Sequence, residues 1–449
     1  MVISTIYIGE PDLDHMASLS KRLKIRESSL PAYLVFSQSL ASIAPLSSTA
    51  AYLTATLLLA GTSSGIASIL GVLMYSLWVY VGYQLSRFFP SEGGTYTFSR
   101  HMYPERVATI LGWMYWGSYM FYLISTSTYA TGVLLPLLGA PISIDRLMEV
   151  VLPSAIVLLM ITGIRPPLYY SLVTSLVEIA VIVVLGITVI AHRGLSLVPL
   201  TPSAGLSQVL SGAMATSFSI AGGGAAFFLG KEARGKGKTV SKSYLLAFLL
   251  ASGAIVFSSI YLVTAGGSTQ GVENLANTGF PGLTVANQYM GESFASAMLL
   301  LTVNSLIGSL IAAYVALSRL TFSLLRTDLP KSTLIVGSLF LGINGVIAGL
   351  GNLVQWYQYF FLGSLTALFI THASLSLGLP KIRNKLALSL LKSFPGILSA
   401  LLMMVGLYSI YLEVGEELVV GILACIVLVM VGVIQGLISR RGEGKSNIS

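Results

Sequence analysis

Long apolar segments are the feature of this sequence that most constrains its fold. A helix that crosses a bilayer needs about 20 largely apolar residues, and the sequence holds twelve such segments. They span residues 32–59, 66–89, 107–137, 148–163, 168–191, 207–230, 243–266, 293–325, 332–350, 352–377, 390–411 and 416–438. The segments are too long for barrel strands and do not alternate apolar with polar residues. We therefore predict an all-α polytopic membrane protein with about twelve transmembrane helices.

The charged residues support this class and give an orientation. Only 9% of the 449 residues are charged and 55% are hydrophobic, which is too few charges to cover the surface of a soluble protein. If the N-terminus lies inside, every lysine and arginine except Arg146 and Arg193 falls on the inner side. This bias predicts a multi-pass membrane protein with both termini in the cytoplasm. It also explains the net charge of +8 without a nucleic-acid partner.

Enzymatic chemistry has no support in the sequence. The single cysteine, Cys425, excludes a disulfide framework and a cysteine cluster for metal or redox chemistry. No metal-ligand spacing, phosphate-binding loop or paired nucleophile and base is present. The histidines His101, His192 and His372 fall near span ends or loops, so none is expected to relay protons at membrane depth. We expect no enzyme, no metal site and no cofactor.

Two of the predicted spans contain residues that break helices. Gly222–Gly224 lie near the middle of span 207–230, although each interior glycine costs a helix about 1 kcal/mol relative to alanine. Pro45 lies at a similar depth in span 32–59, where it removes a backbone hydrogen bond. Matched interruptions in two halves of a chain indicate a transporter site near the bilayer midplane, because the freed backbone groups can bind substrate. Close helix packing through small residues is the alternative explanation for the glycines.

We expect the two breaks to form the substrate site together. The residues predicted to bind substrate are Ala44, Pro45, Leu46, Ser47, Ser48, Phe218, Ala221, Gly222, Gly223 and Gly224. None of them is acidic or basic, which favours a neutral substrate. The sequence gives no further indication of substrate identity and none of oligomeric state.

Glu178 is the only acidic residue placed well inside a predicted span. An ionisable group at that depth is energetically expensive and marks function by default. Glu178 could bind a proton, which is the preferred interpretation, or could hold Na⁺ with Ser305 and Ser309, because hard cations take oxygen ligands. The structural alternative is a glutamate directed toward the inner surface and bridged to Arg165 or to a serine.

Three motifs, in order and spacing, resemble the amino acid–polyamine–organocation (APC) superfamily. They are FFPSEGGTYTFSRHMYPERVATILGWMYW after the second span, FSIAGGGAAFFLGKEARGKGKTVSKS in the sixth and SRLTFSLLRTDLP in the eighth. The resemblance covers roughly residues 30–380 and implies a LeuT-like fold with broken helices 1 and 6 in two inverted repeats. The implied organisation is a tail (1–30), a first repeat of five helices (31–191), a second repeat (207–377), two further helices (390–438) and a second tail (439–449).

The resemblance also implies a function. Members of the superfamily are secondary active transporters that carry amino acids or related amines across the plasma membrane, driven by protons, by Na⁺ or by exchange, so the resemblance implies a plasma-membrane protein. We expect a proton-coupled amino acid symporter, with an exchanger, an amine permease or a Na⁺-coupled symporter as alternatives. A membrane receptor or subunit that does not transport is the alternative from another class, although its helices 1 and 6 should then be continuous. The expected partners are the small-molecule substrate and the lipid bilayer.

Some family positions carry unexpected residues here. The aromatic residue and the acidic or polar residue that often follow the first glycine of helix 6 are replaced by Gly223 and Gly224. The substrate must then be capped from elsewhere, and the candidates are Phe218, Phe227, Tyr119 and Tyr122.

The resemblance further implies positions for the coupling residues and for ion pairs. Glu178 falls where many relatives carry a lysine, which implies a place beside the break of helix 1 and beside helix 8. Ser309 falls where relatives form a cation site. At the inner helix ends, three arginines could pair with acidic residues or could simply anchor the helices at the headgroups. The arginines are Arg100, Arg319 and Arg326, and the acidic residues are Glu92, Glu105, Glu232 and Asp328.

Overall fold

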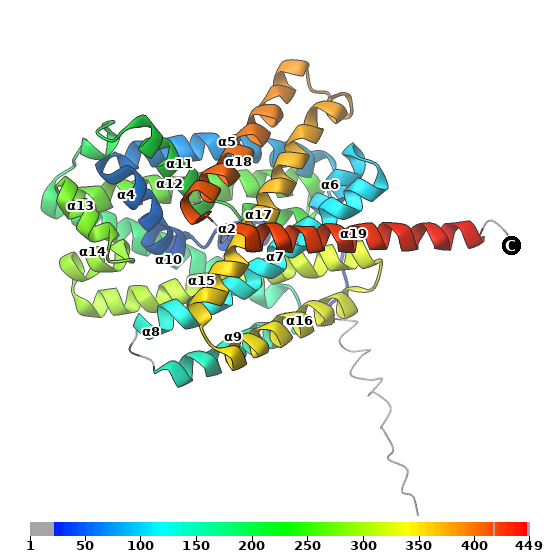
Figure 1. Ribbon diagram of the computed structural model, residues 1–449, viewed down its shortest axis with the longest axis horizontal. Coiled ribbons are helices and arrows are strands. Elements are labelled where there is room, and N and C mark those ends of the chain that lie inside the picture. The colour runs from blue at the N-terminus through cyan, green and yellow to red at the C-terminus, as the bar shows by residue number, and fades with distance from the viewer. Residues whose placement is uncertain (1–21, 138, 140, 416–417, 447–449) are drawn as a thin grey trace, which may run out of the picture.

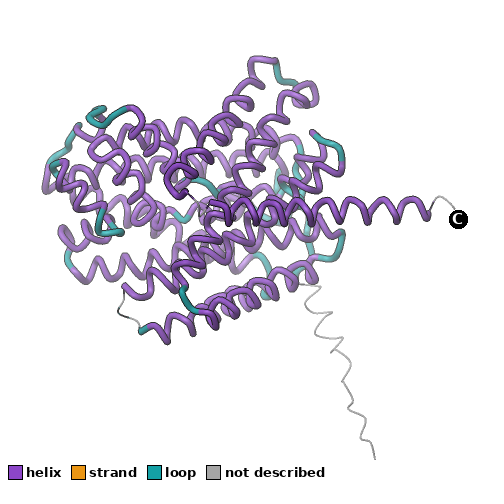
Figure 2. Tube along the Cα trace, viewed as in Figure 1, coloured by secondary structure: helices purple, strands orange, loops and turns teal. Residues whose placement is uncertain are grey.

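The computed structural model describes residues 22–137, 139, 141–415 and 418–446, and these residues form one helical bundle (Figure 1). Figure 2 shows helices joined by short loops. The β pairing in the described part is a single bridge between Leu30 and Ala233. The predicted all-α class is therefore confirmed. The tail residues 1–21 and 447–449 and the start of the last predicted span (416–417) lie outside the described residues.

Each predicted span coincides with one helix or with a short series of helical segments. The first half comprises α2 (Ala32–Ile43), α3 (Pro45–Ser47), η1 (Ser48–Tyr52), α4 (Leu53–Ala60), η2 (Gly61–Ser63), α5 (Ser64–Phe88), α6 (Thr95–Met102), α7 (Glu105–Tyr129), η3 (Ala130–Leu134), α8 (Leu135–Leu137), α9 (Ile142–Met160) and α10 (Arg165–Arg193). The second half comprises η4 (Val198–Leu200), α11 (Leu206–Ser219), η5 (Gly223–Leu229), α12 (Lys236–Gly266), α13 (Thr269–Ala276), α14 (Pro281–Met290), α15 (Glu292–Leu325), α16 (Leu329–Leu350), α17 (Leu353–Gly378), η6 (Leu379–Leu386), α18 (Leu390–Val414) and α19 (Leu418–Ser446). Below, helix 1 is the series from α2 to α4, helix 3 is α7, helix 6 is α11 with η5, and helix 8 is α15.

Ten stretches of the described chain are long and apolar enough to cross a membrane. The first, Ala32–Phe88, contains the first two predicted spans in one run of 57 residues. The predicted span 148–163 lies in α9, which carries three charged residues near its start and is not among the ten. α9 begins at Ile142, and α19 continues to Ser446 beyond the predicted end at 438. The predicted boundaries of these two helices were therefore wrong by several residues.

The two ends of the bundle differ in composition. At one end, α13 and α14 lie beside α4, and α6 and the C-terminal end of α19 lie at the other (Figure 1). The end with α6 carries Arg87, Arg100, Arg319, Arg326 and Lys381, and is called the basic face below. The end with α13 and α14 is called the opposite face.

Between the two faces, α7 packs along α17, and α5 packs against both α11 and α12. Bulky aromatic residues such as Trp78, Tyr115 and Tyr244 are fully buried between these helices. Large apolar residues of α10, such as Val173 and Ile187, are exposed on the outside. An exposed apolar surface of this kind suits contact with lipid tails.

Candidate functional site

The first predicted break occurs between α2 and α3. Ala44 has a left-handed conformation (φ 53°, ψ 68°), and α3 starts at Pro45. Proline is well suited to the first position of a helix because its missing N–H is not needed there. The Ile43 carbonyl, which lies at the break, accepts a hydrogen bond from the Ser48 hydroxyl at 2.8 Å. This bond joins the two halves of the helix.

The second predicted break occurs between α11 and η5. Gly222 has φ +124°, a conformation that residues with a side chain rarely adopt. A Cβ atom at Gly222 would also lie 2.5 Å from the carbonyl oxygen of Ser42. The Ser42 and Ser39 hydroxyls donate to the carbonyls of Gly222 (2.8 Å) and Gly223 (2.7 Å). The glycines therefore serve both purposes considered from the sequence: they break helix 6 and they let it pack against helix 1.

A cavity of about 1520 Å³ begins at the two breaks. It continues between α4, α5, α7, α11, α17 and α18 to the exposed residues Leu58 and Leu206. These two residues lie near the end of α4 and at the start of α11, so the cavity opens toward the opposite face. Its walls carry many aromatic residues and hydroxyl groups, and none of the described residues that line it is Asp, Glu, Lys or Arg.

The predicted substrate residues divide between two places. The residues that line the cavity are Ser48, Phe218, Ala221, Gly222 and Gly224. The other five predicted residues do not line this cavity, and these are Ala44, Pro45, Leu46, Ser47 and Gly223. Successive residues of a helix point in different directions, so Ser48 meets the cavity on one side of the helix while Pro45–Ser47 of α3 meet α10 and α15 on the other.

Glu178 lies on that other side of α3 and is 1% exposed. Its Oε2 accepts hydrogen bonds from the Leu46 N–H at 3.2 Å and from the Ser305 hydroxyl at 2.7 Å. The Ser47 N–H donates to the Ser305 hydroxyl at 3.4 Å. The implied position of Glu178, beside the break of helix 1 and beside helix 8, is confirmed. Of the two partners in the structural alternative, Arg165 or a serine, Glu178 bonds the serine Ser305, whereas Arg165 donates to the Ser29 carbonyl.

Comparison with known protein families identifies the family of this chain. A family model described as amino acid permease matches residues 32–411, which is most of the chain. The chain belongs to the amino acid permease family. It is therefore a member of the APC superfamily, a multi-pass membrane protein and a transporter of amino acids rather than an enzyme. No curated protein matches the chain.

Three of the four aromatic residues considered as substrate caps line the cavity of the permease. Tyr119 and Tyr122 line the cavity as candidate caps, together with Phe218. Phe227 does not line it, because its ring packs between Phe98 (5.5 Å) and Tyr244 (4.7 Å). The selection of Phe227 as a cap was therefore wrong.

Ser309 lies one turn beyond Ser305 and contacts Tyr122, which lines the cavity. Its hydroxyl shares a hydrogen bond of 2.9 Å with Tyr122, whereas Ser305 bonds Glu178. The two predicted coupling serines thus contact different groups. No group of three or more metal-binding side chains occurs in the described part of the chain.

The burial of two titratable residues, Glu149 and His372, was not predicted from the sequence. Glu149 is fully buried in α9 and accepts hydrogen bonds from the hydroxyls of Thr128 (2.7 Å) and Thr131. The late predicted start of this helix hid it, and Pro141, directly before α9, was the available signal. His372 is 2% exposed and lines the cavity, although the sequence placed it near the end of its span.

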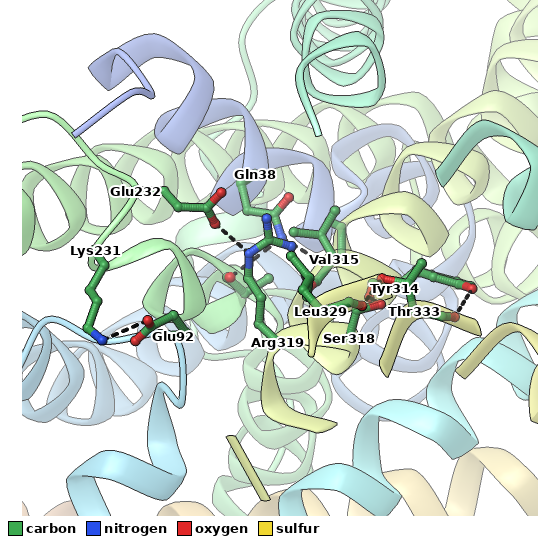
Figure 3. Close-up of polar contacts among 12 residues, drawn as sticks. Gln38, Glu92, Lys231, Glu232, Tyr314, Val315, Ser318, Arg319, Leu329 and Thr333 are labelled. Atoms are coloured by element: carbon green, nitrogen blue, oxygen red, sulfur yellow. Dashed lines mark hydrogen bonds and ion pairs between the residues drawn. The ribbon is translucent and has the colours of Figure 1, made fainter. Parts of the chain in front are cut away.

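Buried charges close the basic face of the permease below the breaks (Figure 3). Arg319 Nε lies 2.6 Å from Glu232 Oε2, with both side chains at most 4% exposed. Arg319 also donates to the Val315 carbonyl at 3.2 Å. Lys231 Nζ lies 2.8 Å from Glu92 Oε1 in a second, more exposed pair. The interpretation of Arg319 as a paired residue is therefore confirmed.

The segment before α2 adds backbone pairing to this closure. Ser28 and Leu30 donate their N–H groups to the carbonyls of Lys231 (3.0 Å) and Glu232 (2.8 Å). In return, the Arg234 N–H donates to the Leu30 carbonyl at 2.8 Å. The start of helix 1 and the end of helix 6 are thereby joined on this face.

The remaining ion pairs of the basic face are more exposed. Glu105 contacts Arg100 at 2.8 Å and Arg326 at 3.6 Å. Asp328 pairs with Lys331 at 3.1 Å. The Asp328 carboxylate also caps α16 by accepting from the Lys331 N–H at 2.8 Å, and this backbone bond lowers the pKa of Asp328. Exposed pairs of this kind contribute little to stability.

Proposed function

We propose that this permease is a secondary active transporter that moves a neutral amino acid together with a proton across the plasma membrane. The observation that carries the proposal is the position of Glu178. This buried carboxylate bonds the first free N–H group of the helix that starts at the substrate cavity. A change in its protonation therefore acts directly on the broken helix.

The ionised carboxylate of Glu178 stabilises the present arrangement in two ways. It accepts hydrogen bonds from Leu46 and Ser305, and its charge favours the positive N-terminal end of the helix that begins at Pro45. Proton binding removes the charge and weakens both hydrogen bonds. The hold of α10 and α15 on helix 1 then loosens, so this helix becomes free to move.

The direction of transport follows from the closed and open faces. With both termini in the cytoplasm, the cavity opens to the outside and the basic face is the closed inner side. Opening the inner side requires the Arg319–Glu232 and Lys231–Glu92 pairs to separate. Two inverted repeats of five helices, 31–191 and 207–377, would supply the symmetric change of alternating access.

The cavity favours a neutral amino acid. Backbone groups at Gly222 and Gly224 and the hydroxyls of Ser42 and Ser48 are the polar groups nearest the breaks. Such groups can bind an α-carboxylate and an α-amino group, while the walls offer no charged partner for a charged side chain. The coupling ion is the only additional small species that this mechanism needs.

Na⁺ is the second candidate for the coupling ion. Oxygen atoms of Ser47, Ser305 and the Thr302 carbonyl lie near Glu178, because Ser47 donates to Thr302 at 3.1 Å and Ser305 donates to Glu178. Such oxygen donors suit a hard cation. The uptake experiment described next distinguishes the two ions.

The test is uptake of labelled neutral amino acids into proteoliposomes, with an inward proton gradient or an inward Na⁺ gradient. We expect the proton gradient to drive accumulation in the wild type. Glu178→Gln should abolish accumulation but keep exchange of internal for external substrate, because exchange needs no net proton movement. Glu149→Gln, at another buried carboxylate that bonds hydroxyl groups, is the matched control and should still accumulate substrate.

The other outcomes are equally informative. Accumulation that requires Na⁺ and ignores pH would assign Glu178 to a sodium site. Exchange without accumulation in the wild type would make the protein an exchanger, and no transport of any amino acid or amine would contradict the proposal.

A further inference from the structure

His372 is a buried polar side chain that no protein group satisfies. It lies on α17, is 2% exposed and lines the substrate cavity. Among the described residues, neither Nδ1 nor Nε2 has a hydrogen-bond partner. Buried polar groups are nearly always bonded, so this imidazole is suited to bind a group that enters the cavity.

The surroundings of His372 are aromatic. Its ring stacks on Trp78 with centroids 3.7 Å apart and planes at 19°, and Tyr115 lies 5.9 Å away. One turn earlier on α17, Phe369 stacks on Phe218 at 4.6 Å. Of these rings, Tyr115 and Phe218 line the cavity with His372, and flat aromatic rings fit an aromatic side chain through stacked and edge contacts.

His372 also lies near the break in helix 6. A Cβ atom at Gly224 would be 3.4 Å from the Tyr115 hydroxyl, and Tyr115 lies beside His372. A substrate whose backbone binds at the break can therefore direct its side chain toward His372. No Asp, Glu, Lys or Arg occurs among the described cavity residues, so the imidazole faces no charge there.

The chemistry of a neutral imidazole defines the preferred partner. One ring nitrogen donates a hydrogen bond and the other accepts one. A phenolic hydroxyl can do either, and an indole or imidazole N–H can donate. A purely hydrocarbon ring can do neither, and would leave His372 without a partner.

We propose that His372 and Tyr115, with Trp78 stacked on the imidazole, form a side-chain subsite that selects bulky neutral amino acids whose aromatic side chain carries a hydrogen-bonding group. His372 is then a specificity-determining residue. The inference rests on the proposed amino acid transport but not on the identity of the coupling ion. It predicts that tyrosine binds better than phenylalanine, which has the same shape without the hydroxyl.

Equilibrium binding to the purified full-length protein in detergent tests the subsite without any ion gradient. Labelled tyrosine is displaced by unlabelled tyrosine or phenylalanine, and their apparent Kd values are compared. We expect phenylalanine to bind at least about tenfold more weakly, because a site built around a hydrogen bond rejects the analogue that lacks it.

Two substitutions separate the hydrogen bond from the packing. His372→Phe keeps an aromatic ring on Trp78 and should bring the two affinities within about twofold, through a loss for tyrosine alone. His372→Gln keeps a donor and an acceptor and should retain part of the preference. Size-exclusion profiles and phenylalanine binding report whether each variant is folded.

Equal affinities in the wild type would overturn the subsite, even if neither variant folds. A His372→Phe variant that weakens both amino acids alike would also overturn it. A tyrosine preference in a protein without proton-driven uptake would support the subsite and contradict only the proposed coupling. Failure to bind either amino acid would overturn the subsite.

Discussion

The two ends of the permease differ in how they meet the same broken helices. On the basic face, helices 1 and 6 are held by the Arg319–Glu232 pair and by backbone pairing of Leu30 with Glu232. On the opposite face, they border a cavity lined by aromatic rings and hydroxyls. Charged contacts thus seal one end while the other remains open to a neutral solute.

This difference shows how the closed basic face can be stable and still be able to open. A buried ion pair is strongly directional, and separation in a dry environment is costly. Separation into water removes that cost, because each charge is then hydrated. The basic face can therefore be stable when it is closed and when it is open to water. Partly opened conformations, in which the charges are separated but not hydrated, are unfavourable.

The largest expected effect comes from breaking the buried pair. Arg319→Ala leaves Glu232 buried without a partner, and should lower the free energy of unfolding by about 3–5 kcal/mol. Thermal unfolding in detergent measures the change. The double variant Arg319→Met/Glu232→Met should recover most of it, and equal losses in the single and double variants would show that packing rather than charge holds this face.

The next effect concerns the break in helix 6. Gly222→Ala should destabilise by about 1–3 kcal/mol, because a side chain at this φ is strained, and it should abolish transport because Cβ meets Ser42. Gly253→Ala is the matched control, since nothing lies within 4 Å of its Cβ. Uptake and unfolding are measured for both. Normal uptake by Gly222→Ala would mean that helix 6 does not need this close approach.

The smallest effect should come from the exposed pair. Lys231 is 48% exposed in its contact with Glu92, and such pairs contribute about 0.2–1 kcal/mol. Lys231→Ala should therefore change stability by no more than that amount. The same unfolding assay provides the comparison. A loss as large as that of Arg319→Ala would mean that burial does not separate the two pairs.

Much of the fold could be predicted because membrane-spanning helices consist of long apolar segments, which are visible in a single sequence. The breaks were also visible, because proline and clustered glycines have direct backbone consequences at Pro45 and Gly222. The burial of Glu178 beside helix 1 followed from the family resemblance. These features depend on local sequence or on position within a known arrangement.

The direction of individual side chains could not be predicted. The left-handed turn at Ala44 resets the rotation of the helix that follows, so Ser48 faces the cavity while Leu46 and Ser47 face the side of Glu178. The burial of His372 depends on α5 and α7, which are distant in sequence and supply Trp78 and Tyr115. Tertiary packing decides such details, and a single sequence does not reveal it.

The most direct test of the account is labelling of each face with a membrane-impermeant thiol reagent in a Cys425→Ser background. Single cysteines replace Ser211, which lines the cavity, and Ser318, which is 1% exposed beside Arg319. At neutral pH, Ser211→Cys should react from the opposite face and Ser318→Cys should be protected.

Addition of substrate at low pH should expose Ser318→Cys to reagent on the basic face and protect Ser211→Cys. Glu178→Gln should remove the pH dependence of this exchange. A pH-dependent exchange that persists unchanged in Glu178→Gln would contradict the account, as would reaction of both cysteines under every condition.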